Sequence, residues 1–134
     1  MKVVLDIETV QAPREEWARL AGIDLVAAES CEAESETDLF SHTAIQECMK
    51  KEDELYERSS FDATYSRIVC IAMLIFSPSM EPKGAVSWYG SNEQDLLRQF
   101  WGRIAEIRPT LFITHNGLGF DLPFIKKRSI IHRV

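Results

Sequence analysis

The segment that most constrains the fold is Arg67–Phe76, a run that is nearly all apolar and rich in β-branched residues. Such a run predicts a central β-strand that is buried on both faces. The turn-forming segments Ser77–Ser79 and Pro82–Gly84 follow it, and Ala85–Tyr89 then predicts a shorter strand. We expect these two strands to form a hairpin.

A helix and a further strand follow the hairpin. Ser91 and Gln94 fit a capping box at the start of the helix. Apolar residues then recur at helical spacing over 96–107, and the aromatic ones among them are expected to be core residues. Arg108–Thr110 ends the helix, and Leu111–Thr114 predicts a short apolar strand.

The first strand is predicted over Val3–Thr9, an apolar run that ends in carboxylates. A strand–helix–strand passage usually yields a parallel pair with a right-handed crossover, so we place Leu111–Thr114 parallel to this strand. A last helix is predicted from Asp121 towards Ile131. The expected fold class is α/β, a mixed sheet flanked by helices.

An acidic insertion over about residues 10–62 separates the first strand from the central one. Pro13 and Gly22 suit the start and stop of a helix over Glu15–Ala21. Ala28–Asp38 is polar and acidic and predicts a loop or frayed segment. Ser41–Arg58 predicts a helix whose apolar stripe docks on the main body. That stripe consists of Ile45, Cys48, Met49, Leu55 and Tyr56. We expect the insertion to be a cap or an interaction surface.

Length and composition indicate one soluble domain. The chain has 134 residues, enough for a single core. Residues 1–62 carry 16 acids and 6 bases, whereas residues 63–134 carry 5 acids and 9 bases, so only the second half favours a phosphate backbone. The three cysteines form no CxxC pair, and we expect reduced, buried thiols. No secretory signal or membrane span is predicted, which favours a cytoplasmic protein.

Asp6 and Glu8 are the first candidate functional residues. Alternate residues of a strand point to the same side, so these two carboxylates lie about 6.6 Å apart along one face. Two like charges held beside an apolar run repel each other, and bound metal ions usually neutralise such a pair. On this stretch alone, two solvated acids at the end of a strand are the better explanation, because the pattern is short and common.

Asn116 and Asp121 follow the strand that we place beside the first one. Because open α/β sheets bind ligands beyond the carboxyl ends of their parallel strands, three carboxylates could meet at this edge. Gly117 and Gly119 would allow a tight turn and a close approach to a ligand. Hard oxygen ligands select Mg²⁺ or Mn²⁺, and a pair of such ions suits phosphoryl transfer. Taken singly, Asp121 also suits a helix N-terminus and Asn116 a turn.

These residues resemble a known family. Leu5–Thr9 is similar to the first motif of the DEDD 3′–5′ exonucleases, and Thr114–Phe124 is similar to their second. The second motif is closest to the proofreading domain of family B DNA polymerases and to stand-alone relatives. The resemblance implies a ribonuclease H-like fold, with 1–134 as a single exonuclease domain or its N-terminal part.

The resemblance also assigns roles to residues. Asp6, Glu8 and Asp121 would be catalytic ligands of two Mg²⁺ or Mn²⁺ ions. Thr9, Asn116 and Phe120 would contact or orient the terminal nucleotides of a nucleic-acid 3′ end, DNA more readily than RNA.

One departure is evident. The family's third motif supplies a further aspartate with a Tyr or His, yet no Asp or Glu follows Asp121. His132 is the only candidate base, and we expect it to have no acidic partner. We expect the C-terminal strand of the fold to be missing as well, in either a fragment of a longer protein or a degenerate homologue, and the exposed sheet edge could pair two copies. An incomplete metal cage predicts weak or no nuclease activity from this chain alone.

Three other functions stay open. The first is an inactive pseudo-nuclease module that binds nucleic acid or a protein partner. Another ribonuclease H-like nuclease, such as a resolvase or an endoribonuclease, is the second. Glycoside hydrolysis by paired carboxylates is the third and weakest, because no aromatic sugar platform accompanies Asp6 and Glu8.

Overall fold

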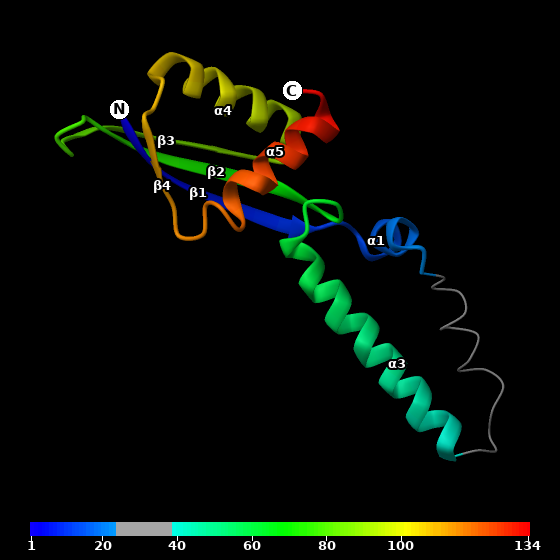
Figure 1. The fold of residues 1–134 in the computed structure, drawn as a ribbon. Coiled ribbons are helices and arrows are strands. Elements are labelled where there is room, and N and C mark those ends of the chain that lie inside the picture. The colour runs from blue at the N-terminus through cyan, green and yellow to red at the C-terminus, as the bar shows by residue number, and fades with distance from the viewer. Residues whose placement is uncertain (24–38) are drawn as a thin grey trace.

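The computed structural model describes residues 1–23 and 39–134, with side chains from residue 46 onward in the second range (Figure 1). The elements are, in chain order, β1 (Lys2–Gln11), α1 (Arg14–Ala21), α3 (Leu39–Arg58), the 3₁₀ turn η1 (Ser59–Phe61), β2 (Ser66–Phe76), β3 (Pro82–Tyr89), α4 (Glu93–Ile107), β4 (Leu111–Ile113) and α5 (Asp121–His132). The predicted loop over Ala28–Asp38 lies outside the described residues.

The four strands form one mixed sheet in the order β3-β2-β1-β4. β2 pairs antiparallel with both β3 and β1, and β4 runs parallel to β1, with Val4 opposite Ile113 as the last pair. The predicted α/β class, the hairpin and the parallel placement of Leu111–Thr114 are therefore confirmed. No fifth strand occurs within 1–23 and 39–134.

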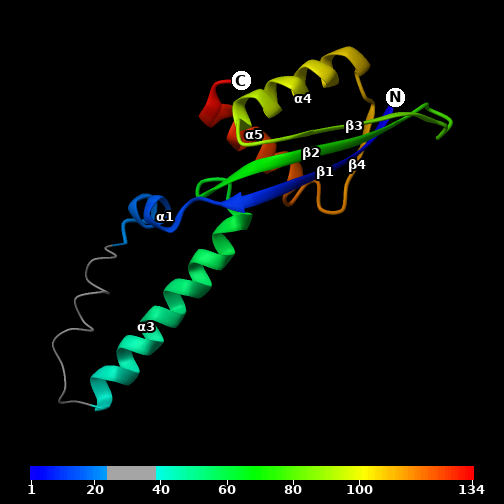
Figure 2. The same ribbon diagram turned by 180° about the vertical axis from the view of Figure 1, so that it is seen from behind.

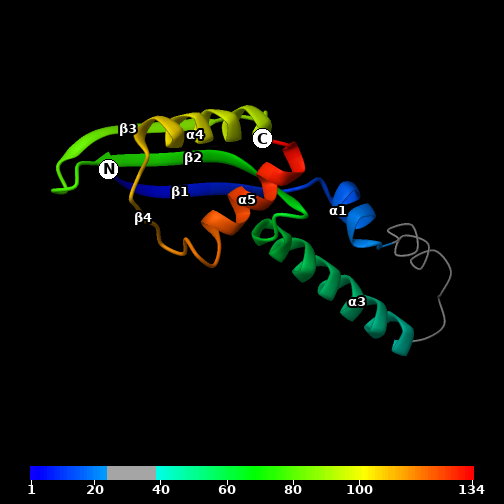
Figure 3. The ribbon, with the colours of Figure 1, turned by 45° about the horizontal axis from the view of Figure 1, so that its top comes forward.

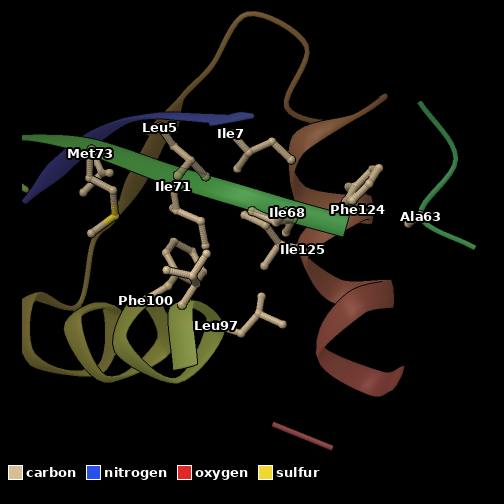
Figure 4. Close-up of a cluster of buried hydrophobic side chains, with 12 residues drawn as sticks. Leu5, Ile7, Ala63, Ile68, Ile71, Met73, Leu97, Phe100, Phe124 and Ile125 are labelled. Carbon is tan, nitrogen blue, oxygen red and sulfur yellow. The ribbon is translucent and has the colours of Figure 1, made fainter. Parts of the chain in front are cut away.

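The core lies between the sheet and the helices α4 and α5, which both pack on the same face (Figures 1, 3 and 4). Leu5 and Ile7 of β1 point into this layer and meet Phe124 and Ile125 of α5 (Figure 4). α4 contributes Leu97 and Phe100, as its apolar spacing predicts. Figure 2 shows the opposite face of the sheet, with the strands lying in front of α5.

β2 is not buried on both faces, contrary to the prediction. Ile68, Ile71 and Met73 are buried, whereas Leu74 on the other face is 48% exposed. The sequence shows a continuous apolar run because the uncovered face of this sheet is itself apolar. β2 therefore lacks the alternation of polar and apolar residues that would indicate one solvent-exposed face.

The predicted start of α4 is wrong by one residue. The N-cap is Asn92, whose side-chain oxygen accepts the backbone N–H of Asp95 at 3.2 Å, and the helix begins at Glu93. Gln94, expected to close a capping box with Ser91, donates to the carbonyl of His132 at 2.9 Å instead. The caps at Gly22 and Arg108 both adopt the left-handed conformation, so both predicted helix ends are confirmed.

α3 contacts the rest of the molecule mainly through its last turns, and the remainder projects away from the sheet (Figures 1 and 3). Tyr56 packs edge-to-face on Trp17 of α1, with centroids 5.3 Å apart, and its hydroxyl donates to the carbonyl of Ala12 at 3.0 Å. Met49 and Leu55 are exposed, so the predicted docking of the whole apolar stripe is wrong. The side chain of Ile45 lies outside the described residues.

Two of the three cysteines also differ from expectation, and Cys31 lies outside the described residues. Cys48 is exposed on the projecting helix, and Cys70 is half-buried, whereas buried thiols were expected. Within the described part of the chain, no helix is both long and apolar enough to cross a bilayer. The cytoplasmic location stays a prediction.

Candidate metal-binding and nucleic-acid site

Asp6 and Glu8 occupy the face of β1 that the helices leave uncovered. Both carboxylates are exposed, whereas Leu5 before them and Ile7 between them are buried. Asp6 lines a shallow, largely apolar hollow of about 350 Å³ over the neighbouring strands, whose floor includes Val4, Ala72 and Leu74. The predicted alternation along this strand is therefore confirmed.

The pairing of β1 with β2 shifts directly after Glu8. Glu8 faces Cys70 and Thr9 faces Ile68, so Val69 has no partner on β1 and forms a β-bulge. A bulge bends the strand and changes the direction of neighbouring side chains. The hydroxyl of Thr9 donates to the carbonyl of Ser60 at 2.9 Å, which ties the end of β1 to η1.

The loop over 114–120 begins where β4 ends. That point lies opposite Val4 of β1, two residues before Asp6. β4 ends opposite Val4, so the edge of β1 beside Asp6 and Glu8 has no further strand partner in the described ranges. The carbonyl of Asn116 accepts the N–H groups of Gly119 at 3.1 Å and Phe120 at 2.7 Å. The loop is thus held in one compact turn beside an open strand edge.

The two loop glycines are needed for close packing. A Cβ at Gly119 would lie 2.5 Å from Oδ1 of Asn116, and a Cβ at Gly117 would overlap the hydroxyl of Thr114. Both glycines permit a close approach to the backbone, as predicted. The groups that approach are the side chains of Asn116 and Thr114 of the same loop, where a ligand was expected. Asn116 is exposed and, with His115 and Leu118, lines an open hollow of about 600 Å³.

Asp121 is the first residue of α5 and is only 4% exposed. It shares one helix face with the core residues Phe124 and Ile125, so its carboxylate faces the sheet. No hydrogen bond or ion pair engages this carboxylate within the described part of the chain. Because no side-chain oxygen there is both fully buried and unpartnered, the carboxylate still touches solvent. A largely buried carboxylate without a protein partner is stabilised by a nearby cation.

Phe120, directly before Asp121, belongs to an aromatic row. Its ring lies 5.2 Å from that of Phe124 and packs edge-to-face on Phe61 of η1, with centroids 6.0 Å apart. The ring is half-buried, and that of Phe61 is 71% exposed. The row therefore begins in the core and ends at the surface.

The structure places Asp6 and Glu8 on one face of β1, but it does not gather all three predicted ligands. α5 packs on the covered face of the sheet, and the two strand carboxylates lie on the other face. Among residues 1–23 and 46–134, no three His, Cys, Asp or Glu side chains lie close enough to hold a metal ion. The donors themselves are hard oxygens, which fit Mg²⁺ or Mn²⁺. The shared metal site stays a prediction.

Comparison with protein families gives a match over residues 58–134, more than half of the chain. The matching family is described as predicted 3′–5′ exonucleases related to the exonuclease domain of PolB. The chain belongs to this family. The match includes the whole of the second motif and Asp121, and the family agrees with the resemblance drawn from the sequence.

Individual relatives of this family member are catalytic subunits of DNA polymerase epsilon. The one from Saccharomyces cerevisiae is 40% identical over 58 residues, and the one from Kluyveromyces lactis is 36% identical over 58 residues. Each of these matches covers 42% of this chain and 3% of the relative. A catalytic subunit from Arabidopsis thaliana is 39% identical over 44 residues, which is 33% of this chain and 2% of the relative.

One cluster in this exonuclease-family chain was missed by sequence reasoning. His132 does have an acidic partner, contrary to expectation: its Nε2 lies 2.7 Å from Oε2 of Glu93. Arg128 adds a bidentate pair to the same carboxylate, with Nε to Oε1 at 2.9 Å. The spacing of Arg128 and His132 by one helical turn was the available signal, but Glu93 lies on another helix.

Glu93 is 4% exposed and is kept ionised by its partners. Burial alone would raise the pKa of its carboxyl. Hydrogen bonds from Arg128, from the N–H of Ile68 and from His132 outweigh burial, so the pKa lies below its ordinary value. The cluster is therefore an ion pair at neutral pH.

Proposed function

We propose that this chain forms the metal-binding part of a 3′–5′ exonuclease that hydrolyses phosphodiester bonds at nucleic-acid 3′ ends. Asp6, Glu8 and Asp121 would hold two Mg²⁺ or Mn²⁺ ions between the uncovered face of β1 and its open edge. Such ions, when bound, activate a water and stabilise the leaving oxygen.

The observation that carries this proposal is the state of Asp121. It is buried, it begins a helix beside an open strand edge, and it has no partner in the described part of the chain. A purely structural N-terminal acid would be expected to accept hydrogen bonds from its own helix or from a neighbour. A carboxylate that has no protein partner and still reaches solvent is free to bind a cation.

The chain's own groups have distinct roles in this proposal. Asp6 and Glu8, exposed and unpaired within the described residues, would hold the ions on one face of β1. Asn116, fixed in its turn by Gly119 and Phe120, would donate hydrogen bonds to the terminal nucleotide.

Thr9 and Phe120 would support the nucleotide in different ways. The hydroxyl of Thr9 already donates to the carbonyl of Ser60. Thr9 would therefore orient the end of β1 and would not contact the base itself. The ring of Phe120, with Phe61 beside it, would offer an aromatic surface to the terminal base.

We propose single-stranded DNA as the substrate class. The three relatives described above are named as catalytic subunits of DNA polymerase epsilon, and this name indicates an enzyme that acts on DNA. The exposed cations Lys126 and Arg133 of the last helix and its cap would attract the phosphate backbone, because Lys127 already pairs with Asp62 and Arg128 with Glu93. RNA with the same terminal sequence is the comparison that separates the two substrates.

The test measures metal binding first and hydrolysis second. Calorimetric titration with Mn²⁺ should show binding to the wild-type chain and a loss of at least tenfold in affinity for Asp6→Asn. Any Mn²⁺-dependent shortening of a 5′-labelled single strand should disappear in the same variant. Glu106→Gln, at an exposed acid on α4 that pairs with Arg103, is the matched control. Absence of Mn²⁺ binding, or unchanged shortening by Asp6→Asn, would contradict the proposal.

A second candidate is an inactive module that binds nucleic acid or a protein partner. It is favoured by the lack of three clustered metal-binding side chains among the described residues. The exposed apolar residues of α3, Met49 and Leu55, would offer a partner surface. In the titration above, this candidate predicts no Mn²⁺ binding, together with DNA affinity that Asp6→Asn leaves unchanged.

We also propose that two copies can pair through β4. Leu111 and Ile113 of this outer strand are exposed, and an apolar strand edge favours pairing with another chain. Light scattering should give a dimer mass for the wild type and a monomer mass for Ile113→Lys. A monomer at all concentrations would exclude pairing.

A further inference from the structure

The outer edge of β2 is completed by a helix residue where β3 stops. β3 ends at Tyr89, which faces Cys70, whereas β2 starts at Ser66. Beyond β3, the carbonyl of Val69 accepts the N–H of Gly90 at 3.0 Å. The N–H of Ile68 donates to Oε1 of Glu93 at 2.7 Å. Glu93 thus takes the place of a strand partner at this position.

This position coincides with the bulge opposite the candidate site. Val69 is the residue without a partner on β1, between the pairs that Glu8 and Thr9 form with Cys70 and Ile68. A bulge is stable only where its neighbouring backbone groups are satisfied. The carboxylate of Glu93 therefore helps to set the path of β2 at the point where β1 carries Glu8.

The second oxygen of Glu93 binds α5. Oε2 lies 2.5 Å from an Nη of Arg128 and 2.7 Å from Nε2 of His132. The other Nη of Arg128 donates to the carbonyl of Ala63, just before β2, at 3.1 Å. Arg128 lies two helical turns after Asp121, so these contacts fix the height of Asp121 along the sheet.

We infer that Glu93 is a positioning residue of the proposed site, holding the bulge beside Glu8 and the helix of Asp121 in one fixed relation. This inference rests on the proposed function for its role in catalysis, but its structural content does not. His132 accordingly acts as a partner of Glu93 in this arrangement and not as a general base. A buried ion pair can often be replaced by apolar residues without loss of stability. A single side chain that joins the bulge to α5, by contrast, needs a carboxylate in the position of Glu93.

The test compares Glu93→Gln with Trp101→Phe. Glutamine keeps the size of the side chain and an acceptor for Ile68, but it removes the charge that holds Arg128. Trp101→Phe removes another contact between α4 and α5, the hydrogen bond from Trp101 Nε1 to Ser129 Oγ at 2.8 Å, and leaves β2 untouched. Urea unfolding curves would establish that both variants are folded under the conditions of the measurements.

Two measurements decide the outcome. Amide NMR shifts of Glu8, Thr9 and Asp121 should move in Glu93→Gln and stay in place in Trp101→Phe. Mn²⁺ affinity should fall about tenfold in Glu93→Gln only, as is usual for residues that orient metal ligands.

The outcomes separate this inference from the proposed function. Unmoved amides in a folded Glu93→Gln variant would overturn the inference, whether or not the chain binds Mn²⁺. Equal Mn²⁺ affinity in wild type and Glu93→Gln would also overturn it. Failure of the wild type to bind Mn²⁺ would overturn the proposed function and leave the amide shifts to decide the positioning role.

Discussion

Phe120 packs edge-to-face on Phe61, so the residue before Asp121 is braced by the end of the insertion. The contact joins η1 to the start of α5, two segments that are distant in the sequence. Phe61 is 71% exposed, yet it has a defined partner.

The first prediction concerns this aromatic pair. Phe61→Ala should lower the free energy of unfolding by about 1 kcal/mol, because an aromatic pair contributes beyond its buried area. Urea denaturation followed by circular dichroism measures the change. Leu55→Ala, at a residue of α3 that is 58% exposed, should change it by less than about 0.5 kcal/mol. Equal effects of the two substitutions would show that the ring contact contributes nothing specific.

The second prediction concerns the glycines of the loop. Gly119→Ala should displace the side chain of Asn116 and weaken binding of a single-stranded DNA 3′ end several-fold, measured by fluorescence anisotropy. Gly102→Ala is the control, since Gly102 lies in α4 with nothing within 4 Å of the added Cβ. That variant should keep its DNA affinity and gain roughly 1 kcal/mol in stability from helix propensity. DNA binding by Gly119→Ala at wild-type strength would remove Asn116 from the proposed contact set.

The third prediction follows from the lowered pKa of Glu93. The carboxyl of Glu93 has a folded-state pKa below its ordinary value of 4.5. Its ionised form therefore stabilises the fold at pH values above about 4.5, and this stabilisation is lost as pH falls through the folded-state pKa. Near neutral pH, Glu93→Gln should cost about 3 kcal/mol, because Arg128 loses its buried partner.

Denaturant unfolding of wild type and Glu93→Gln between pH 7 and pH 3 measures this difference. The difference in unfolding free energy between the two proteins should narrow below pH 4.5. A gap that is the same at pH 3 as at pH 7 would mean that the carboxylate charge does not stabilise the fold.

The fourth prediction links metal binding to stability. Mn²⁺ at 100 times its dissociation constant should stabilise the wild type by about 2.7 kcal/mol, because it binds the folded state alone. Asp121→Asn should remove this gain, and Glu106→Gln should keep it. Differential scanning calorimetry with and without Mn²⁺ measures both. Retention of the full gain by Asp121→Asn would exclude Asp121 as a ligand.

The order of elements and the sheet were predictable because each strand and helix carries a local signal. Val3–Thr9 and Leu111–Thr114 are short apolar runs, and the helix between the hairpin and the second run dictates a parallel crossover. Two errors arose where packing, not local sequence, decides. The apolar run of β2 gave no sign that one of its faces is open, and the stripe on α3 gave no sign that the helix projects.

The candidate site was only partly predictable for the same reason. Alternation along β1 places Asp6 and Glu8 on one face without any tertiary information. The position of Asp121 relative to them depends on how a seven-residue loop passes the edge of β1, which residue spacing cannot give. Glu93 was overlooked because its partners, Ile68 and Arg128, lie on other elements, and only the assembled fold brings them together.

The placement of the insertion has a consequence for how the chain folds. β1 and β2 are neighbours in the sheet, yet residues 12–65 lie between them, a connection about tenfold longer than the turn between β2 and β3. Closing the longer connection costs roughly 2 kcal/mol more in chain entropy. We therefore expect the β2–β3 hairpin and α4 to assemble first, with β1 joining as a late step of refolding. The strand that bears Asp6 and Glu8 would then be the last to gain protection in pulsed hydrogen exchange.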